Sequence, residues 1–355
     1  MRNKGAVMRN ETIFSALLEA IPLAGLLITD EERILCANSA ATLLFGDNLV
    51  GLAYISVLRH PSVLNAIEVT LGGQAEAKTR YTAALGDQDV TYDMTCRRVK
   101  LAKKNLILVC FRDVTDVEQA TQMRRDFVAN VSHELRTPLT TLSGFIETLQ
   151  GPAREDEAAR KRFLGIMSKE AARMNRLVDD LLSLSRVESV ERMRPIEQVE
   201  LNTLLQSCII TMAAPAKSEK VDITLLGDES SEYFIQGDED QLRQVFNNLL
   251  ENAIKYGGAN GRITVGIELV DHDATLRGPA ICLCVCDTGP GIDPLHIPRL
   301  TERFYRVDSH RSRAVGGTGL GLAIVKHIVN RHRGRLTIAS TLGEGTAFSI
   351  LLPAL

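Results

Sequence analysis

One histidine, His133, lies in a segment whose residue types and spacing suit nucleophilic chemistry. A carboxylate follows it directly at Glu134, and a hydroxyl and a proline follow one helical turn later at Thr137 and Pro138. Neutral imidazole is a competent nucleophile near pH 7, and an adjacent carboxylate can take or orient its proton. The segment therefore predicts an imidazole that can accept a phosphoryl group.

The predicted helix around His133 should hold the imidazole in solvent. Its apolar residues recur at alternating spacings of three and four, which is typical of a packed helical stripe. At about 100° per residue, His133 lies roughly 140–200° from the nearest stripe residues. For a histidine taken alone, an ordinary surface position on a coiled coil would explain the same pattern. The stripe comprises Val128, Val131, Leu135, Leu142, Phe145 and Leu149, with Pro138 at the position that interrupts it.

A second predicted helix, over residues 241–256, carries polar residues that share one face. Asn248 and Asn252 are four residues apart, and Lys255 and Tyr256 follow one turn later. Carboxamide oxygens can ligate Mg²⁺, and a lysine ammonium group can bind phosphate. Taken alone, such a spacing is equally typical of a polar helix face in solvent.

Glycines follow at two later points. Asp287 ends an apolar stretch and precedes Gly289 and Gly291. A carboxylate there can accept a hydrogen bond from an adenine amino group while the glycines let the backbone approach the ring, although a plain turn has the same composition. Residues 316–321 contain four glycines, of which Gly317, Gly319 and Gly321 stand at every second position, and they open a helix whose free N–H groups could face phosphates. No strand leads directly into these glycines, which argues against a Rossmann fingerprint.

The run from Phe127 to Leu139 resembles the H-box of sensor histidine kinases at every fixed position of that pattern. The resemblance implies that His133 accepts a phosphoryl group from ATP and that Glu134 takes or orients the imidazole proton. It also implies that Thr137 positions a water molecule for dephosphorylation of a partner protein.

The later motifs resemble, in the same order, the boxes of the Bergerat-type ATP-binding domains of these kinases. The resemblance implies that Asn252 ligates Mg²⁺ with support from Asn248, and that Asp287 reads adenine. Phe304-Tyr305-Arg306 matches a further box, which implies a lid over ATP with Arg306 near the phosphates. The nucleotide-binding residues implied in this way are Asn248, Asn252, Lys255, Tyr256, Asp287, Gly289, Gly291, Tyr305, Arg306, Gly317, Thr318, Gly319, Leu320, Gly321 and Thr346.

The bulk composition fits a globular protein of two or three domains. The chain has 355 residues, of which 45% are hydrophobic, and its net charge of −3 gives no electrostatic case for nucleic acid. No apolar run reaches the ~20 residues that a membrane-spanning helix needs, so we expect no membrane segment in this chain. We expect a cytoplasmic location, either free or attached through a partner or an anchor upstream of this sequence. The seven cysteines contain no CxxC pair, which favours reduced thiols over a metal site.

We expect a multidomain α+β fold with three parts. Residues 1–116 resemble a PAS-like α/β sensor domain. Within it, residues 17–29 predict a helix that runs into a strand, and residues 30–46 predict a turn, a strand and a helix. Residues 117–192 predict two long amphipathic helices, the first over 117–150 and the second to about residue 187. They form a hairpin that can bury its stripe by forming a dimeric four-helix bundle. Residues 196–355 predict a Bergerat-type α/β sandwich with helices on one sheet face. The predicted strands span 78–84, 90–98, 106–113, 221–226, 262–270, 281–286, 335–339 and 347–352, and the predicted helices of the last part span 201–213, 241–256 and 320–332.

These resemblances imply a homodimeric histidine kinase that uses ATP and Mg²⁺. It would pass its phosphoryl group to an aspartate of a separate response regulator, of the OmpR/PhoB-like type, and would also dephosphorylate that regulator. Arg59-His60-Pro61 and the order of segments look most like the phosphate-regulon sensors of the family. One alternative is a sensor scaffold with a degenerate nucleotide site, which would show departures in the motifs. Another is an Hsp90- or MutL-like ATPase, for which Glu251 supplies a candidate catalytic carboxylate.

Overall fold

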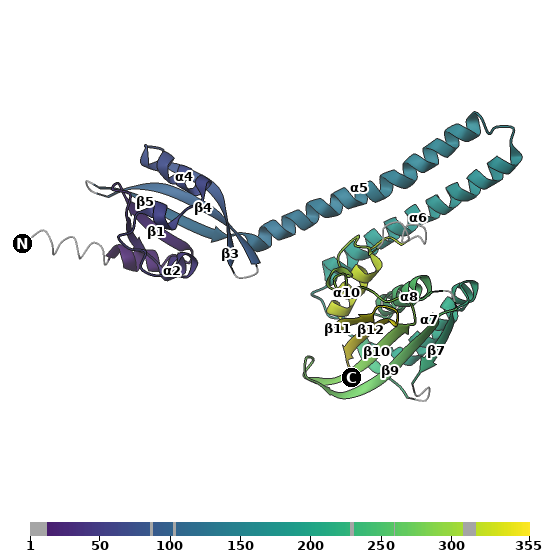
Figure 1. Ribbon diagram of the computed structural model, residues 1–355. Coiled ribbons are helices and arrows are strands. Elements are labelled where there is room, and N and C mark those ends of the chain that lie inside the picture. Colours follow the sequence, from purple (N-terminus) through teal and green to yellow (C-terminus); the bar gives the residue numbers. More distant parts are fainter. Residues whose placement is uncertain (1–12, 86–87, 102–103, 228–230, 259, 308–316) are drawn as a thin grey trace, which may run out of the picture. The chain divides into compact units, whose positions relative to one another are not determined.

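The computed structural model describes residues 13–85, 88–101, 104–227, 231–258, 260–307 and 317–355. The chain divides into two compact units, residues 1–126 and 127–355 (Figure 1). Among the described helices, none combines the length and the apolar character that crossing a lipid bilayer requires.

The first unit is built on a five-stranded antiparallel sheet with the strand order β2-β1-β5-β4-β3. The three strands predicted over 78–84, 90–98 and 106–113 are confirmed, and each extends beyond its predicted range. In chain order the strands are β1 (Ala24–Thr29), β2 (Ile34–Ala37), β3 (Glu76–Leu85), β4 (Gln88–Leu101) and β5 (Lys104–Asp113).

Helices cover both faces of this sheet. One face buries Ile28, Val109 and Phe111 beneath three helices, and the other buries Leu27 and Leu106 beneath the helical residues 13–19. Of the helices on the first face, α2 (Ser39–Phe45) is confirmed within residues 30–46, whereas α3 (Tyr54–Val57) and α4 (Pro61–Leu71) were not predicted.

The helix α5 (Thr115–Gln150) starts directly after β5. An Asp113 carboxylate oxygen accepts hydrogen bonds from the backbone N–H and the hydroxyl of Thr115, at 2.9 and 2.6 Å. The Thr115 hydroxyl also accepts from the backbone N–H of Thr91 in β4, at 3.0 Å. These bonds fix the first turn of α5 to the sheet.

The second unit begins with a helical hairpin, as predicted. From Phe127 onward α5 continues as one helix through Pro138, which is buried, and α6 (Glu157–Val190) follows after a short turn. Phe145 and Phe163 stack across the two helices with ring centroids 4.9 Å apart. Several apolar side chains of the hairpin remain exposed in the single chain, including Val128 of the predicted stripe. They are Val128, Leu139, Ile146, Leu164, Val178 and Leu182.

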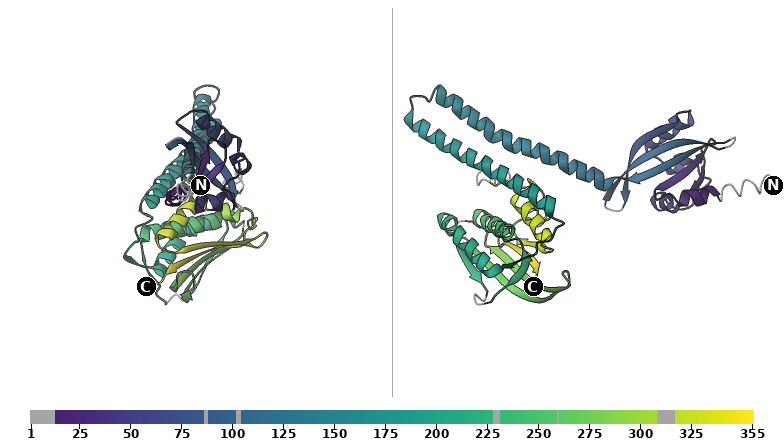
Figure 2. Two further views of the ribbon diagram at one scale, coloured as in Figure 1. Left: turned by 90° about the vertical axis from the view of Figure 1, so that its left-hand side faces the viewer. Right: turned by 180° about the vertical axis from the view of Figure 1, so that it is seen from behind.

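The remainder of the second unit is an α/β sandwich (Figure 2). Its mixed sheet has the order β11-β12-β10-β9-β7, in which only β7 and β9 are parallel. Three helices lie on one side of the sheet and bury residues such as Phe246 and Ile324 against Val265, Leu283 and Ile350. All predicted strands and helices of this part are confirmed. They are α7 (Leu201–Ser218), β7 (Asp222–Leu226), α8 (Glu239–Tyr256), β9 (Arg262–Asp273), β10 (Gly278–Asp287), α10 (Gly321–Arg331), β11 (Arg335–Thr341) and β12 (Gly345–Pro353).

A small two-stranded sheet of β6 (Glu197–Glu200) and β8 (Phe234–Gly237) was not predicted. It lies beside the sandwich, where Val199 and Ile235 join the same hydrophobic core. A short 3-10 helix, η1 (Ile297–Arg299), precedes the segment that matched the lid.

Candidate functional site

A pocket of about 400 Å³ opens between α8, the end of β10, the segment before α10 and one side of α6. It gathers all but two of the residues predicted to bind nucleotide. The exceptions are Gly289, whose backbone N–H donates to Asp287, and Leu320, which is fully buried in the core. The predicted residues that line the pocket are Asn248, Asn252, Lys255, Tyr256, Asp287, Gly291, Tyr305, Arg306, Gly317, Thr318, Gly319, Gly321 and Thr346.

Helix α8 supplies a polar wall of this pocket. The Asp238 side chain accepts from the backbone N–H of Gln241 at 3.2 Å, which caps the helix and fixes where it begins. The spacing of four then brings both Asn248 and Asn252 to the pocket. Among the described residues, the Nδ2 atom of Asn248 is buried and has no hydrogen-bond partner. This wall therefore fits a ligand with phosphate oxygens, and carboxamide oxygens are ligands that Mg²⁺ accepts.

Asp287 lies at the end of β10, in register with Thr346 of β12. Its carboxylate accepts from the Gly289 N–H at 2.9 Å, and burial raises the pKa of Asp287 above its ordinary value. Gly291 has a φ of 71°, and a Cβ atom there would overlap the carbonyl group of Thr341. Only glycine fits this turn, which brings the backbone close to the pocket.

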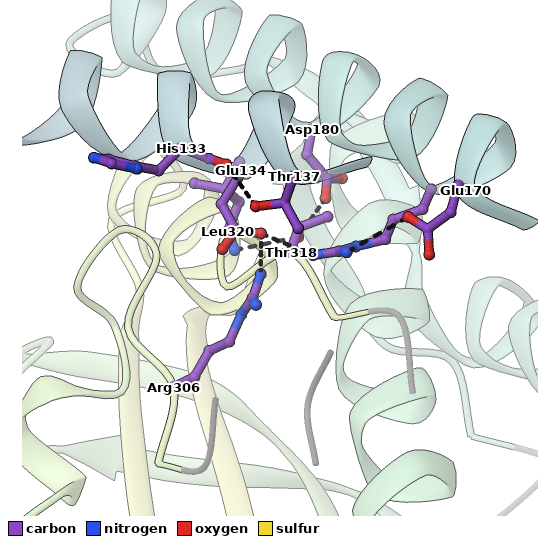
Figure 3. Close-up of polar contacts among 9 residues, drawn as sticks. His133, Glu134, Thr137, Glu170, Asp180, Arg306, Thr318 and Leu320 are labelled. Atoms are coloured by element: carbon purple, nitrogen blue, oxygen red, sulfur yellow. Dashed lines mark hydrogen bonds and ion pairs between the residues drawn. The ribbon is translucent and has the colours of Figure 1, made fainter. Parts of the chain in front are cut away.

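The glycine-rich segment enters α10 at the edge of the pocket, although residue 316 lies outside the described residues. Gly319 has a φ of 75°, and a Cβ atom there would lie 2.9 Å from the backbone of Phe304. The Thr318 hydroxyl accepts from the backbone N–H of Leu320 at 3.3 Å and donates to Oδ2 of Asp180 at 2.7 Å (Figure 3). A side chain of α6 is thus hydrogen-bonded to the loop predicted to bind phosphates.

His133 is exposed on α5, as the helical periodicity predicts. Its ring is directed away from the side chains of Arg306 and Thr318 (Figure 3). The hydroxyl of Thr137, which lies one turn later, donates to the backbone carbonyl of His133 at 3.2 Å. The imidazole is therefore accessible from solvent but is not aimed at the pocket of its own chain in this arrangement.

Glu134 is held by two arginines rather than facing the imidazole alone. Its Oε2 atom accepts from Nη2 of Arg173 on α6 at 2.8 Å and from Nη2 of Arg306 at 3.3 Å. The three side chains are 17%, 13% and 8% exposed, so water screens these ion pairs only weakly. Arg306 lines the pocket as predicted, but its charge is directed to Glu134. Among the described residues, its Nε atom is buried without a hydrogen-bond partner.

Two family models match this chain, one after the other. Residues 123–190 match the His Kinase A (phospho-acceptor) domain, and residues 237–355 match the histidine kinase-, DNA gyrase B-, and HSP90-like ATPase family. Together the two ranges cover more than half of the chain and contain both His133 and most of the pocket. The chain belongs to the sensor histidine kinases.

Curated relatives agree with this assignment, and a solved structure shares the fold. The phosphate regulon sensor protein PhoR of Pseudomonas aeruginosa is 44% identical over 247 residues, which are 70% of this chain and 53% of that protein. The sensor protein kinase WalK of Staphylococcus aureus (strain Newman) is 33% identical over 341 residues, 93% of this chain and 53% of that protein. The chain therefore spans about half the length of these relatives. The crystal structure of histidine kinase ThkA in complex with response regulator protein TrrA shares the fold, with a TM-score of 0.52 and 21% identity over 96% of this chain and 98% of that one.

The contribution of α6 to the pocket of this histidine kinase was not predicted from the sequence. Arg176, Asp179 and Asp180 line it, and Arg173 holds Glu134. A signal was present, because charged residues at spacings of three and four form a polar stripe along this helix. The stripe indicates a shared face but does not indicate which surface that face meets.

Proposed function

We propose that this chain is an ATP-dependent protein histidine kinase that phosphorylates its own His133 and passes the phosphoryl group to an aspartate of a response regulator. One observation carries the proposal: a single compact unit combines an exposed imidazole in a matched phospho-acceptor segment with a pocket that gathers nearly all predicted nucleotide residues. The PhoR and WalK relatives support the kinase activity, and the TrrA protein bound to ThkA indicates the class of partner. An OmpR/PhoB-like regulator remains our specific expectation for that partner.

In the proposed step, the distal ring nitrogen of His133 attacks the γ-phosphorus of ATP. A nitrogen–phosphorus bond forms, the bond from that phosphorus to the β–γ bridging oxygen breaks, and ADP leaves. Glu134 takes the ring proton that the attack makes acidic. Glu134 is paired with Arg306 and Arg173 in the present arrangement, so it must exchange partners before it can serve the imidazole.

The pocket residues would bind and orient the nucleotide. Asp287 would accept from the adenine amino group, and Lys255 would offset charge on the phosphates. Asn252, with Asn248, would hold Mg²⁺, which supplies further positive charge beside the phosphates when it is bound. The Nζ atom of Lys255 lies 2.8 Å from Glu251 on the same helix, so this lysine already lies at the polar wall of the pocket.

We infer that the kinase acts as a homodimer through its hairpin. Apolar side chains of both helices remain exposed in the single chain, including Leu139, Ile146, Leu164 and Leu182, which are 44–56% exposed. Two helices cannot bury such residues on all sides, whereas a four-helix bundle can. Because the His133 ring points away from its own pocket, transfer requires an ATP-binding part, of the same or the partner chain, to move over the ring.

We propose that the chain has three domains, residues 1–116, 117–192 and 196–355. The first of them, which makes up most of the first compact unit, is proposed to be a PAS-like sensor domain. Its support is the antiparallel sheet with the order β2-β1-β5-β4-β3 and three helices packed on one face. Two hydrogen bonds support it further, because they connect this sheet to the first turn of α5: the Thr115 N–H donates to Asp113, and the Thr91 N–H donates to the Thr115 hydroxyl.

A second activity is proposed for the same hairpin, namely dephosphorylation of the phosphorylated regulator. Thr137 follows His133 by four residues and is exposed on the same face of α5. Among the described residues, the Thr137 hydroxyl is hydrogen-bonded only to the backbone carbonyl of His133, so an oxygen lone pair is free to orient a water molecule.

The kinase proposal is tested by incubating the full chain with γ-labelled ATP and Mg²⁺. We expect acid-labile, alkali-stable label on the protein, its absence in His133→Gln, and its persistence in the control His272→Gln, which alters an exposed histidine of β9. Addition of an OmpR/PhoB-like receiver domain should then remove label from the kinase.

Two results would contradict this proposal. Label that persists in His133→Gln would place the acceptor elsewhere. Release of inorganic phosphate without any protein label would favour the ATPase alternative, in which Glu251 activates water, and Glu251→Gln should then abolish the release.

A further inference from the structure

Two groups expected to bind nucleotide phosphates are paired instead with carboxylates of the helical hairpin (Figure 3). Arg306 contacts Glu134 of α5 at 3.3 Å, and the Thr318 hydroxyl donates to Asp180 of α6 at 2.7 Å. Carboxylate and phosphate oxygens are both anionic hydrogen-bond acceptors, and arginine and hydroxyl donors bind both. The hairpin therefore presents the same chemistry to this loop that a nucleotide would present.

Asp180 contacts the loop at Thr318, just before the N-terminus of α10, where anions are favoured. The Thr318 hydroxyl also accepts from the Leu320 N–H, immediately before the first turn of α10. The N-terminus of a helix carries partial positive charge and free N–H groups, which is why phosphates bind there. Asp180 also lines the nucleotide pocket, so its carboxylate lies where a phosphate oxygen is expected.

Burial disfavours the charged form of the Asp180 carboxylate where it contacts the loop. Burial raises its pKa above the ordinary value, and the nearby Glu251 acts in the same direction, while the bond from Thr318 acts against them. A group whose charged form is partly desolvated holds its partner less firmly than the bond length alone suggests. The contact can therefore be exchanged for a ligand of the same charge.

We propose that Asp180 and Glu134 compete with nucleotide phosphates for Thr318 and Arg306, so that the hairpin and the nucleotide exclude each other at this loop. The inference rests on the proposed function, because it takes the pocket to be the ATP site. By linkage, the factor by which hairpin docking weakens nucleotide binding equals the factor by which nucleotide weakens docking. ATP would thus both supply the phosphoryl group and release the hairpin that must receive it.

The test compares two neighbouring variants of the full chain, Asp180→Ala and Asp179→Ala. Both residues line the pocket on α6 and both variants remove one negative charge, but only Asp180 contacts Thr318. Affinity for ADP with Mg²⁺ is measured by titration calorimetry. If the contact holds about nine-tenths of the molecules in the docked state, its removal should tighten ADP binding about tenfold, or about 1.4 kcal/mol. Asp179→Ala removes one negative charge beside the pocket without breaking the Thr318 contact, so its effect on ADP affinity should be at least about threefold smaller than that of Asp180→Ala; equal tightening in the two variants would overturn the inference.

Hydrogen exchange of the unaltered chain provides a measurement that needs no variant. ADP should increase exchange in α6 around residues 173–190, and Asp180→Ala should show that increase without ADP. Equal ADP affinities in the two variants and the unaltered chain would overturn the inference, as would exchange in α6 that ADP leaves unchanged. Failure of all three chains to bind ADP would overturn the proposed function as well. Labelling of His133 together with equal affinities would overturn only the competition.

Discussion

Replacement of His332 should destabilise the nucleotide-binding sandwich by an amount that depends on pH. This histidine follows α10 and is 1% exposed. Its Nε2 atom accepts from the backbone N–H of Asp238 at 3.0 Å, and its Nδ1–H donates to the carbonyl of Ile328 at 2.8 Å. Only the neutral imidazole ring can accept one hydrogen bond and donate the other. His332 therefore connects the end of α10 to the cap of α8, the two helices that carry the glycine-rich and asparagine motifs.

The variant His332→Leu keeps a similar apolar volume and leaves the N–H of Asp238 without its acceptor. A buried polar group that loses its partner costs about 1–3 kcal/mol. For a unit of this size, 1 kcal/mol corresponds to about 2–4 °C in Tm, so a loss of about 2 kcal/mol lowers Tm by about 4–8 °C. These values apply near pH 7.5, where the ring is neutral in both the folded and the unfolded chain.

Below that pH the difference between the two proteins should shrink. Burial lowers the pKa of His332 below its ordinary value, so the unfolded chain takes up a proton before the folded one does. The contribution of the ring to stability is therefore present above the unfolded pKa and is lost as pH falls toward the folded pKa. For one histidine with an unfolded pKa of about 6.5, the loss between pH 7.5 and 5.5 is at most about 1.4 kcal/mol.

Thermal unfolding of the full chain, followed at pH 7.5 and pH 5.5, measures the stability that His332→Leu loses and how that loss changes with pH. The Tm gap between the unaltered protein and His332→Leu should be smaller at pH 5.5, whereas the control His272→Gln, an exposed position on β9, should leave no gap at either pH. A gap of the same size at both pH values would show that His332 acts through packing alone and would refute the reasoning from its neutral ring.

Two further changes test individual residues of the site. Thr137→Ala should slow dephosphorylation of the phosphorylated regulator by at least about tenfold, because this activity needs the hydroxyl, while labelling of His133 stays within about twofold. Equal loss of both activities would contradict the role assigned to Thr137. Asp287→Asn should weaken ADP binding by about 10–100-fold, since a hydrogen bond to a charged group contributes about 1.5–3 kcal/mol. An unchanged affinity in calorimetry would contradict adenine recognition by this carboxylate.

The sequence predicted the elements whose signals are local. The strand over 90–98 alternates, and the helix over 117–150 keeps one period over many turns, so both were found without knowledge of their partners. Helix α4 was missed although Pro61 at its first position and apolar residues at spacings of three and four are typical of a helix. The sheet of β6 and β8 could not be found in this way, because residues 197–200 pair with residues 234–237 across an intervening helix and strand, and four residues carry little periodic signal.

The sequence predicted those parts of the site whose residues lie in contiguous motifs. The motifs around Asn252, Asp287 and Gly319 are each local, and the sandwich brings them to one pocket. The contribution of α6 was not predictable, because it depends on how the hairpin packs against the sandwich. Asp180 belongs to no glycine or asparagine motif, and its contact with Thr318 joins residues 138 positions apart.

The pairing of Glu134 with Arg306 connects the two halves of the proposed reaction. Glu134 is the residue expected to take the imidazole proton, and Arg306 is the residue expected to stabilise charge on the phosphates. In the present arrangement each neutralises the other at 3.3 Å, so neither is available to its substrate. Phosphates that draw Arg306 away would leave Glu134 with Arg173 as its remaining arginine partner, at 2.8 Å. The same exchange of partners would therefore supply both the cation at the phosphates and the base beside His133, and only when nucleotide is bound.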